Sequence, residues 1–119
     1  MITAFLASCG DRCVRISELE GKRVAIWGYG REGRAALAAL RWRLPRQPVT
    51  VFCSPDEAEP LRGMQDPALR IEIAVDADAL CEHDVVIKSP GISPYASPAA
   101  DAALRGVRFV GASGLWFAE

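Results

Sequence analysis

The sequence lacks most of the features on which a catalytic or membrane-bound protein depends. Histidine occurs once, as His83, so the serines share a single candidate base and a metal site has few possible ligands. The phosphate-binding pattern G-x-x-x-x-G-K-[ST] and the nucleophile pattern G-x-S-x-G are both missing. No apolar run approaches the ~18 residues of a membrane span, and no basic region of a signal peptide opens the chain. These absences favour a binding module without a catalytic centre and without a membrane partner.

Charge and cysteine content narrow the class further. The 14 basic and 15 acidic residues give a net charge of −1, which is no electrostatic footprint for nucleic acid. The four cysteines are Cys9, Cys13, Cys53 and Cys81. Their spacing matches neither a disulfide framework nor a zinc pattern, so we expect reduced thiols in a cytoplasmic protein and no bound metal. The length predicts one domain, 1–119, in which 1–20 is a less defined N-terminal extension.

Three glycines at G-x-G-x-x-G spacing are the strongest local signal. Gly28, Gly30 and Gly33 follow an apolar run at 24–27 and precede an alanine- and leucine-rich stretch at 34–43. In a strand–turn–helix of this kind, the first glycine permits the tight turn and the second lets a pyrophosphate approach the backbone. The third lets the helix pack closely on the strand. The start of the helix then offers N–H groups to an anion.

Apolar, β-branched stretches alternate with helical patterns along the rest of the chain. The predicted strands are 23–27, 49–52, 69–74, 85–87 and 107–110, and the predicted helices are 32–42, 55–63, 76–80 and 97–104. Ser97 is the expected N-cap of the last helix, with Pro98 as its first residue. The third strand alternates apolar and charged residues and should lie at an edge, whereas 85–87 is apolar throughout and should be central. The pattern predicts an α/β, Rossmann-like, doubly wound parallel sheet of order 3-2-1-4-5.

Three loops should meet at the carboxyl ends of these strands, where such folds bind ligands: 28–33, 53–55 and 89–91. An NAD-binding domain carries an acidic residue about 20 positions beyond the glycines, at the end of the second strand. Cys53 stands there instead, and the nearest acids, Asp56 and Glu57, belong to the next predicted helix. An NAD(P)-binding module of a redox or regulatory protein is therefore disfavoured but stays an alternative.

A second motif is more specific than the glycine turn. The stretch 84–92 reads D-x-V-x-x-S-P-G-I, and 107–111 is followed by Leu115 and Trp116. Together with the glycine turn, these residues resemble the N-terminal domain of the Mur ligases over about 20–119. The resemblance implies that this domain binds the UDP part of UDP-N-acetylmuramoyl-L-alanine, to which an ATP-dependent ligase adds glutamate in peptidoglycan synthesis. It also implies that ATP and Mg bind a central domain and glutamate a C-terminal domain, both absent from this chain.

The resemblance also implies a set of ligand contacts. The residues expected to bind substrate are Gly28, Gly30, Arg31, Glu32 and Gly33 at the diphosphate, Cys53, Ser54 and Pro55 at the uracil, and Ser89, Pro90 and Gly91 at the sugar–diphosphate side. The family often has an apolar residue and Thr at positions 31 and 32, Asp-Thr-Arg at 53–55, and Gly-Asp-x-Glu at 111–114, so this chain departs at all three. No catalytic residue is expected, and we expect a monomer that is inactive on its own. The stereochemistry of the glutamate stays open.

Each assignment has a structural alternative. The three glycines would then serve only the turn and helix packing, 89–91 would be an ordinary loop, and Arg31 would be a solvated surface residue. Trp27 and Trp116 are expected in the core.

Overall fold

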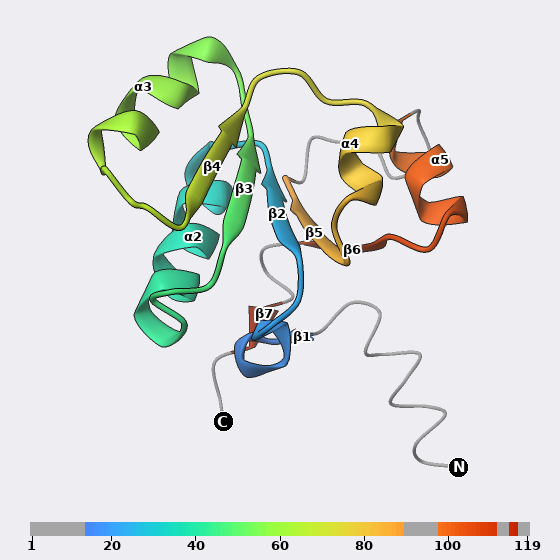
Figure 1. The fold of residues 1–119 in the computed structure, drawn as a ribbon, viewed down its shortest axis with the longest axis horizontal. Helices are drawn as coiled ribbons and strands as arrows, with labels where there is room; N and C mark the ends of the chain where they lie inside the picture. The colour runs from blue at the N-terminus through green and yellow to red at the C-terminus, as the bar shows by residue number, and fades with distance from the viewer. Residues whose placement is uncertain (1–13, 90–97, 112–114, 117–119) are drawn as a thin grey trace.

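The computed structural model describes residues 14–89, 98–111 and 115–116, and within them a five-stranded parallel sheet forms the centre of the domain (Figure 1). The strands of this sheet are β2 (Val24–Trp27), β3 (Val49–Phe52), β4 (Leu69–Glu72), β5 (Val85–Lys88) and β6 (Arg108–Gly111). Their spatial order is β4-β3-β2-β5-β6, which confirms the predicted order 3-2-1-4-5. The strand before the glycine turn is therefore central, and the strand order reverses beside it.

The register places the ends of the central strands level with one another. Trp27, the last residue of β2, pairs with Phe52 of β3 and with Lys88 of β5. The loops that follow these three strands consequently leave the sheet at the same edge. β4 lies at one side of the sheet and its residues are exposed or only partly buried, as the alternating pattern predicted, whereas 85–87 of β5 are buried.

Helices cover both faces of the sheet. They are α2 (Arg31–Arg43), α3 (Pro55–Gly63), α4 (Ala77–Cys81) and α5 (Ala99–Leu104). One apolar cluster joins α2 and α3 to the face that carries Ile26, and a second joins α4 and α5 to the face that carries Ala25. Successive strand residues point to opposite faces, so β2, β3, β5 and β6 contribute to both clusters, whereas the edge strand β4 contributes only to the first. This two-sided burial is the doubly wound arrangement that the sequence predicted.

Helix starts depart from prediction by one or two residues. Asp76 lies outside α4 as its N-cap, where its carboxylate accepts a hydrogen bond from the N–H of Ala79 at 2.8 Å. Pro98, expected as the first residue of the last helix, is instead the N-cap of α5, and Ser97 lies outside the described residues. A proline has no N–H to donate, so either position at a helix start suits it.

A two-stranded parallel sheet that the sequence did not predict joins the two ends of the described chain. Strand β1 (Val14–Arg15) pairs with β7 (Leu115–Trp116). The 3-10 helix η1 (Ile16–Leu19) follows β1 and buries Ile16 and Leu19 in the same cluster as α2. The segment that precedes β2 therefore packs against the core.

The tryptophan predictions have separate outcomes. Trp27 is only half-buried, in contact with Phe109 at 6.4 Å between ring centroids, and packs against the second apolar cluster. The side chain of Trp116 lies outside the described part of the structure.

None of the described helices is long and apolar enough to cross a membrane.

Candidate functional site

The glycine turn after β2 has the geometry that its spacing predicted. Gly28 has a φ of +96°, a conformation that L side chains rarely adopt. A Cβ on Gly33 would overlap the carbonyl oxygen of Gly28, so the third glycine brings α2 against the end of β2. At Gly30, in contrast, a Cβ would meet no atom of the described residues within 4 Å. The first and third glycines thus have structural roles, and the middle one leaves open space in front of the backbone.

The helix α2 begins directly at this open space. Gly30 is its N-cap, and the carbonyl oxygen of Gly30 accepts the N–H of Arg34 at 2.9 Å. The N–H groups that precede Arg34 in the helix have no intrahelical partner, and the dipole makes this end electropositive. Arg31 is exposed and Glu32 is half-buried. The turn can therefore receive an anion, while contacts of Arg31 and Glu32 with a diphosphate stay predictions.

A pocket of about 320 Å³ lies beside the turn, at the carboxyl ends of β2 and β3. Its lining consists of Trp27, Gly28, Phe52, Cys53, Ser54, Glu57, Ile73 and Val75. The pocket therefore combines an apolar, partly aromatic wall with a few polar groups. Three of the sequence-predicted residues, Gly28, Cys53 and Ser54, come together here. Pro55 does not line the pocket and is the exposed first residue of α3.

The end of β3 is tied to its neighbours by backbone hydrogen bonds. The N–H of Gly28 donates to the carbonyl oxygen of Phe52 at 2.7 Å, and the N–H of Cys53 donates to the carbonyl oxygen of Glu72 at 3.0 Å. Cys53 is buried, and this burial together with the nearby charge of Glu57 raises the pKa of its thiol. The thiol is thus kept neutral in the pocket wall.

Glu57 is a pocket residue that sequence reasoning missed. It lies in α3, as predicted, but its carboxylate reaches back to the end of β3. Oε1 accepts the N–H of Ser54 at 3.1 Å and the N–H of Tyr29 at 3.4 Å. The hydroxyl of Ser54 in turn accepts the N–H of Glu57 at 3.2 Å, which completes a capping box. The spacing S-x-x-E at 54–57 is the sequence signal that predicts this contact.

Ser89 ties the third loop to the same end of the sheet. Its N–H and its hydroxyl both donate to the carbonyl oxygen of Trp27, at 3.0 and 3.2 Å. Ser89 therefore holds the end of β5 against the residue that precedes the glycine turn. Pro90 and Gly91, the other residues predicted on this side, lie outside the described residues.

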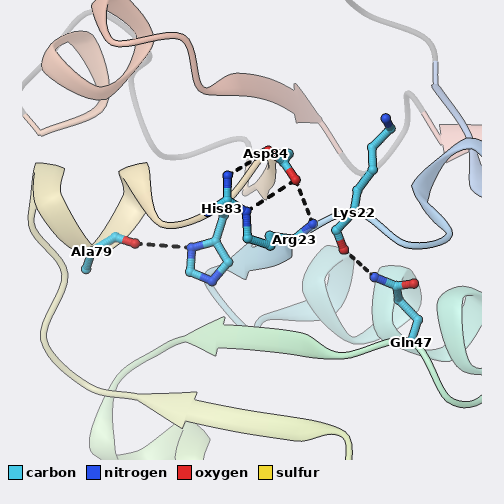
Figure 2. Close-up of polar contacts among 6 residues, drawn as sticks. All are labelled: Lys22, Arg23, Gln47, Ala79, His83 and Asp84. Atoms are coloured by element: carbon cyan, nitrogen blue, oxygen red, sulfur yellow. Dashed lines mark hydrogen bonds and ion pairs between the residues drawn. The ribbon is translucent and has the colours of Figure 1, made fainter.

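Asp84 is the first residue of the D-x-V-x-x-S-P-G-I motif and directly precedes β5 (Figure 2). It therefore lies at the end of this strand that is away from the glycine turn. The carboxylate of Asp84 accepts the N–H of Arg23 at 2.9 Å and its guanidinium Nη2 at 3.0 Å. The side-chain hydrogen bond from Arg23, with the backbone bond from the same residue, lowers the pKa of Asp84. Asp84 thus aligns the starts of β2 and β5 and does not reach the pocket.

Two further residues in Figure 2 also have structural roles. His83 places Nδ1 3.1 Å from the carbonyl oxygen of Ala79, and burial lowers the pKa of its imidazole. It precedes β5, so it lies at the strand end away from the glycine turn. The amide of Gln47 donates to the carbonyl oxygen of Lys22 and accepts the N–H of Gly21 at 3.0 Å.

Among the described residues, no group of histidine, cysteine and acidic side chains could hold a metal ion.

The sheet and its helices define an α/β, Rossmann-like domain, with a glycine turn between its central strand and the helix that follows. Comparison with known proteins finds homologues among the UDP-N-acetylmuramoyl-L-alanine--L-glutamate ligases, and the chain matches the N-terminal domain of these Mur ligases. It is 57% identical over 106 residues to the UDP-N-acetylmuramoyl-L-alanine--L-glutamate ligase of Xanthomonas campestris. The enzymes of the same name from Xylella fastidiosa and Micromonospora are 52% identical over 105 residues and 35% identical over 108 residues.

These matches are extensive for this chain and partial for the relatives. They cover 89%, 88% and 89% of the chain, but 23%, 22% and 24% of the respective ligases. The chain thus spans about a quarter of the length of the curated relatives that it matches. No protein-family model and no solved structure matches the chain.

Proposed function

We propose that this chain binds the UDP moiety of UDP-N-acetylmuramoyl-L-alanine, as the substrate-docking domain of a ligase in peptidoglycan synthesis. The relatives are named for adding L-glutamate to this substrate, so we extend L-glutamate to the complete protein. In that protein the reaction is ATP-dependent, and ATP with Mg binds outside the present chain. Residues 1–119 alone should show neither ATP hydrolysis nor ligation, because they offer no nucleophile–base pair and no Walker lysine.

The observation that carries the proposal is the difference between the glycines of the turn. Gly33 is required by its contact with the carbonyl of Gly28, whereas none of the described residues occupies the space in front of Gly30. That open space faces the start of a 13-residue helix, where a diphosphate would be stabilised by N–H groups and by the helix dipole. A side chain at residue 30 would thus obstruct a ligand that approaches the backbone, and not another part of the described protein.

The neighbouring pocket suits the uracil. A flat ring can pack against the aromatic side chains of Trp27 and Phe52. The hydroxyl of Ser54, which accepts the N–H of Glu57, still has its O–H to donate to the polar edge. These groups lie one loop away from the turn, so a nucleoside diphosphate can place its phosphates at α2 and its base at the end of β3. Ser89 lies on the third side, where the sugar attached to the diphosphate would extend.

An NAD(P)-binding module is the second candidate, and one observation favours it. Although Cys53 occupies the expected position of the acidic residue, Glu57 brings a carboxylate to the glycine turn. Dinucleotide-binding domains use a carboxylate in this region to hold the adenosine ribose. The relatives, which are named for a UDP-linked substrate, support the uridine nucleotide instead.

Calorimetric titration of residues 1–119 distinguishes the two candidates. UDP-N-acetylmuramoyl-L-alanine and UDP should bind, and NAD and NADP should bind more weakly or not at all. The affinity should be low, because a ligand exposed on one side of a single domain gains fewer contacts to offset the entropy lost on binding. Tighter binding of NAD or NADP than of the UDP compounds would overturn the proposal.

A further inference from the structure

Glu57 is the one acidic residue that lines the pocket, and its position is set by two loops at once. The N–H of Tyr29 comes from the glycine turn after β2, and the N–H of Ser54 comes from the loop after β3. Both donate to the same carboxylate oxygen, at 3.4 and 3.1 Å. The carboxylate therefore stands at the junction between the open space at Gly30 and the apolar wall of the pocket.

This carboxylate still has acceptor capacity for a ligand. A carboxylate offers about four lone-pair sites, and the two backbone bonds use two of them. Among the described residues, both hydrogen bonds to this carboxylate reach Oε1, and the side chain is half-buried, not enclosed. A partner of Glu57 must be a donor, because a carboxylate donates no hydrogen bond.

The three parts of a nucleotide differ in how they suit this position. A diphosphate is an anion and would be repelled by the carboxylate. The base requires the apolar wall formed by Trp27, Phe52, Ile73 and Val75, which continues beyond Glu57. The ribose is covalently placed between phosphate and base, and its two neighbouring hydroxyls are donors.

We propose that Glu57 recognises the ribose of the bound nucleotide by accepting hydrogen bonds from its hydroxyl groups. This inference rests on the proposed binding of a uridine nucleotide and names the residue that selects ribonucleotides over deoxyribonucleotides. Glu57 would reach the ribose from the first turn of α3. It would thereby supply the carboxylate that dinucleotide-binding domains carry at the position of Cys53. The capping box with Ser54 holds it in place before the ligand arrives.

Affinities for UDP, 2′-deoxy-UDP and 3′-deoxy-UDP test this role on residues 1–119 and on Glu57→Gln. The wild-type chain should bind at least one deoxy analogue about tenfold more weakly than UDP, since a hydrogen bond to a charged group is lost. In Glu57→Gln this selectivity should fall severalfold. The amide oxygen of the glutamine can still accept the N–H of Ser54, so the capping contact is kept. Asp56→Asn is the matched control, because it removes the same charge from an exposed position in the same helical turn. All three ligands carry the same diphosphate, so general charge effects cancel in the ratio.

Two results would overturn the inference while leaving the proposed function intact: equal binding of UDP and both deoxy analogues to the wild-type chain, or unchanged selectivity in Glu57→Gln. Failure of UDP itself to bind the wild-type chain would remove the proposed function, and the ribose contact with it. The wild-type affinity for UDP therefore separates the two failures.

Discussion

The position that a Cβ of Gly33 would take lies only 2.1 Å from the carbonyl oxygen of Gly28. Any side chain at residue 33 must push α2 away from the end of β2 or distort the turn. We expect Gly33→Ala to lower the free energy of unfolding by about 1–3 kcal/mol, the usual cost of overpacking. Urea unfolding followed by circular dichroism measures this. Gly30→Ala is the matched control and should cost little, because its Cβ meets open space; equal losses in both variants would contradict this account of the turn.

Gly30→Val should abolish binding of UDP while leaving the fold intact. The added methyl groups would occupy the space through which a diphosphate approaches the backbone at the start of α2. Calorimetry gives the affinity and circular dichroism gives the fold. Gly63→Val provides the comparison, since Gly63 also faces open space but ends α3. Normal UDP binding by Gly30→Val would show that the diphosphate does not use this turn.

Arg41 and Asp66 form the most buried ion pair among the described residues, with side chains 16% and 13% exposed. Arg41 also donates to the carbonyl oxygens of Gln47 at 2.7 Å and Ala68 at 3.2 Å. It thereby joins α2 to the loops before β3 and β4. We expect Asp66→Asn to lower the free energy of unfolding by about 2–4 kcal/mol, because it leaves the guanidinium without its counter-charge. Chemical denaturation at pH 7 tests this expectation.

The same ion pair predicts a pH dependence. Burial alone would raise the pKa of Asp66, but hydrogen bonds from Arg41 and from the N–H of Ala68, with the charge of Arg41, lower it overall. A carboxyl whose pKa is lower in the folded state stabilises the fold above its unfolded pKa, about 3.9. This contribution is lost as the pH falls through the folded value. The stability difference between wild type and Asp66→Asn should therefore shrink below about pH 4; a constant difference down to pH 2 would argue against it.

Asp84 should affect alignment of the sheet and not ligand binding. It bonds to Arg23 at the amino ends of β2 and β5, away from the pocket, although it opens the most specific motif of the chain. Both side chains are largely exposed, so Asp84→Asn should change stability little. The affinity for UDP should match that of the wild type. A large loss of affinity at unchanged stability would mean that Asp84 communicates with the site.

Local patterns predicted the main sheet well because they coincide with what the core requires. The β-branched run 49–52 forms β3 with those bounds, and Pro55 begins α3 while Gly63 ends it. The order of the strands followed from β–α alternation and from the half-exposed pattern of β4. In these cases one segment carries its own signal, and tertiary structure agrees with it.

Two features lay beyond this kind of reasoning. The pairing of β1 with β7 joins two-residue strands about a hundred residues apart, and strands so short have no periodicity to detect. The contact of Glu57 with Tyr29 depends on where a side chain of α3 reaches relative to the loop that follows β2. The capping-box spacing indicates that Glu57 turns back to Ser54, but not that a second loop meets it there.

Chemical-shift mapping by NMR tests the central claim most directly. Titration of ¹⁵N-labelled chain with UDP-N-acetylmuramoyl-L-alanine should shift the amides of Gly30 and Arg31 at the start of α2. Cys53 and Ser54 beside the pocket should shift with them, at ligand concentrations where NAD causes no change. Shifts confined to other parts of the sheet, or the same amides responding to NAD at lower concentration than to the UDP compound, would contradict the assignment of this domain as a uridine-nucleotide docking module.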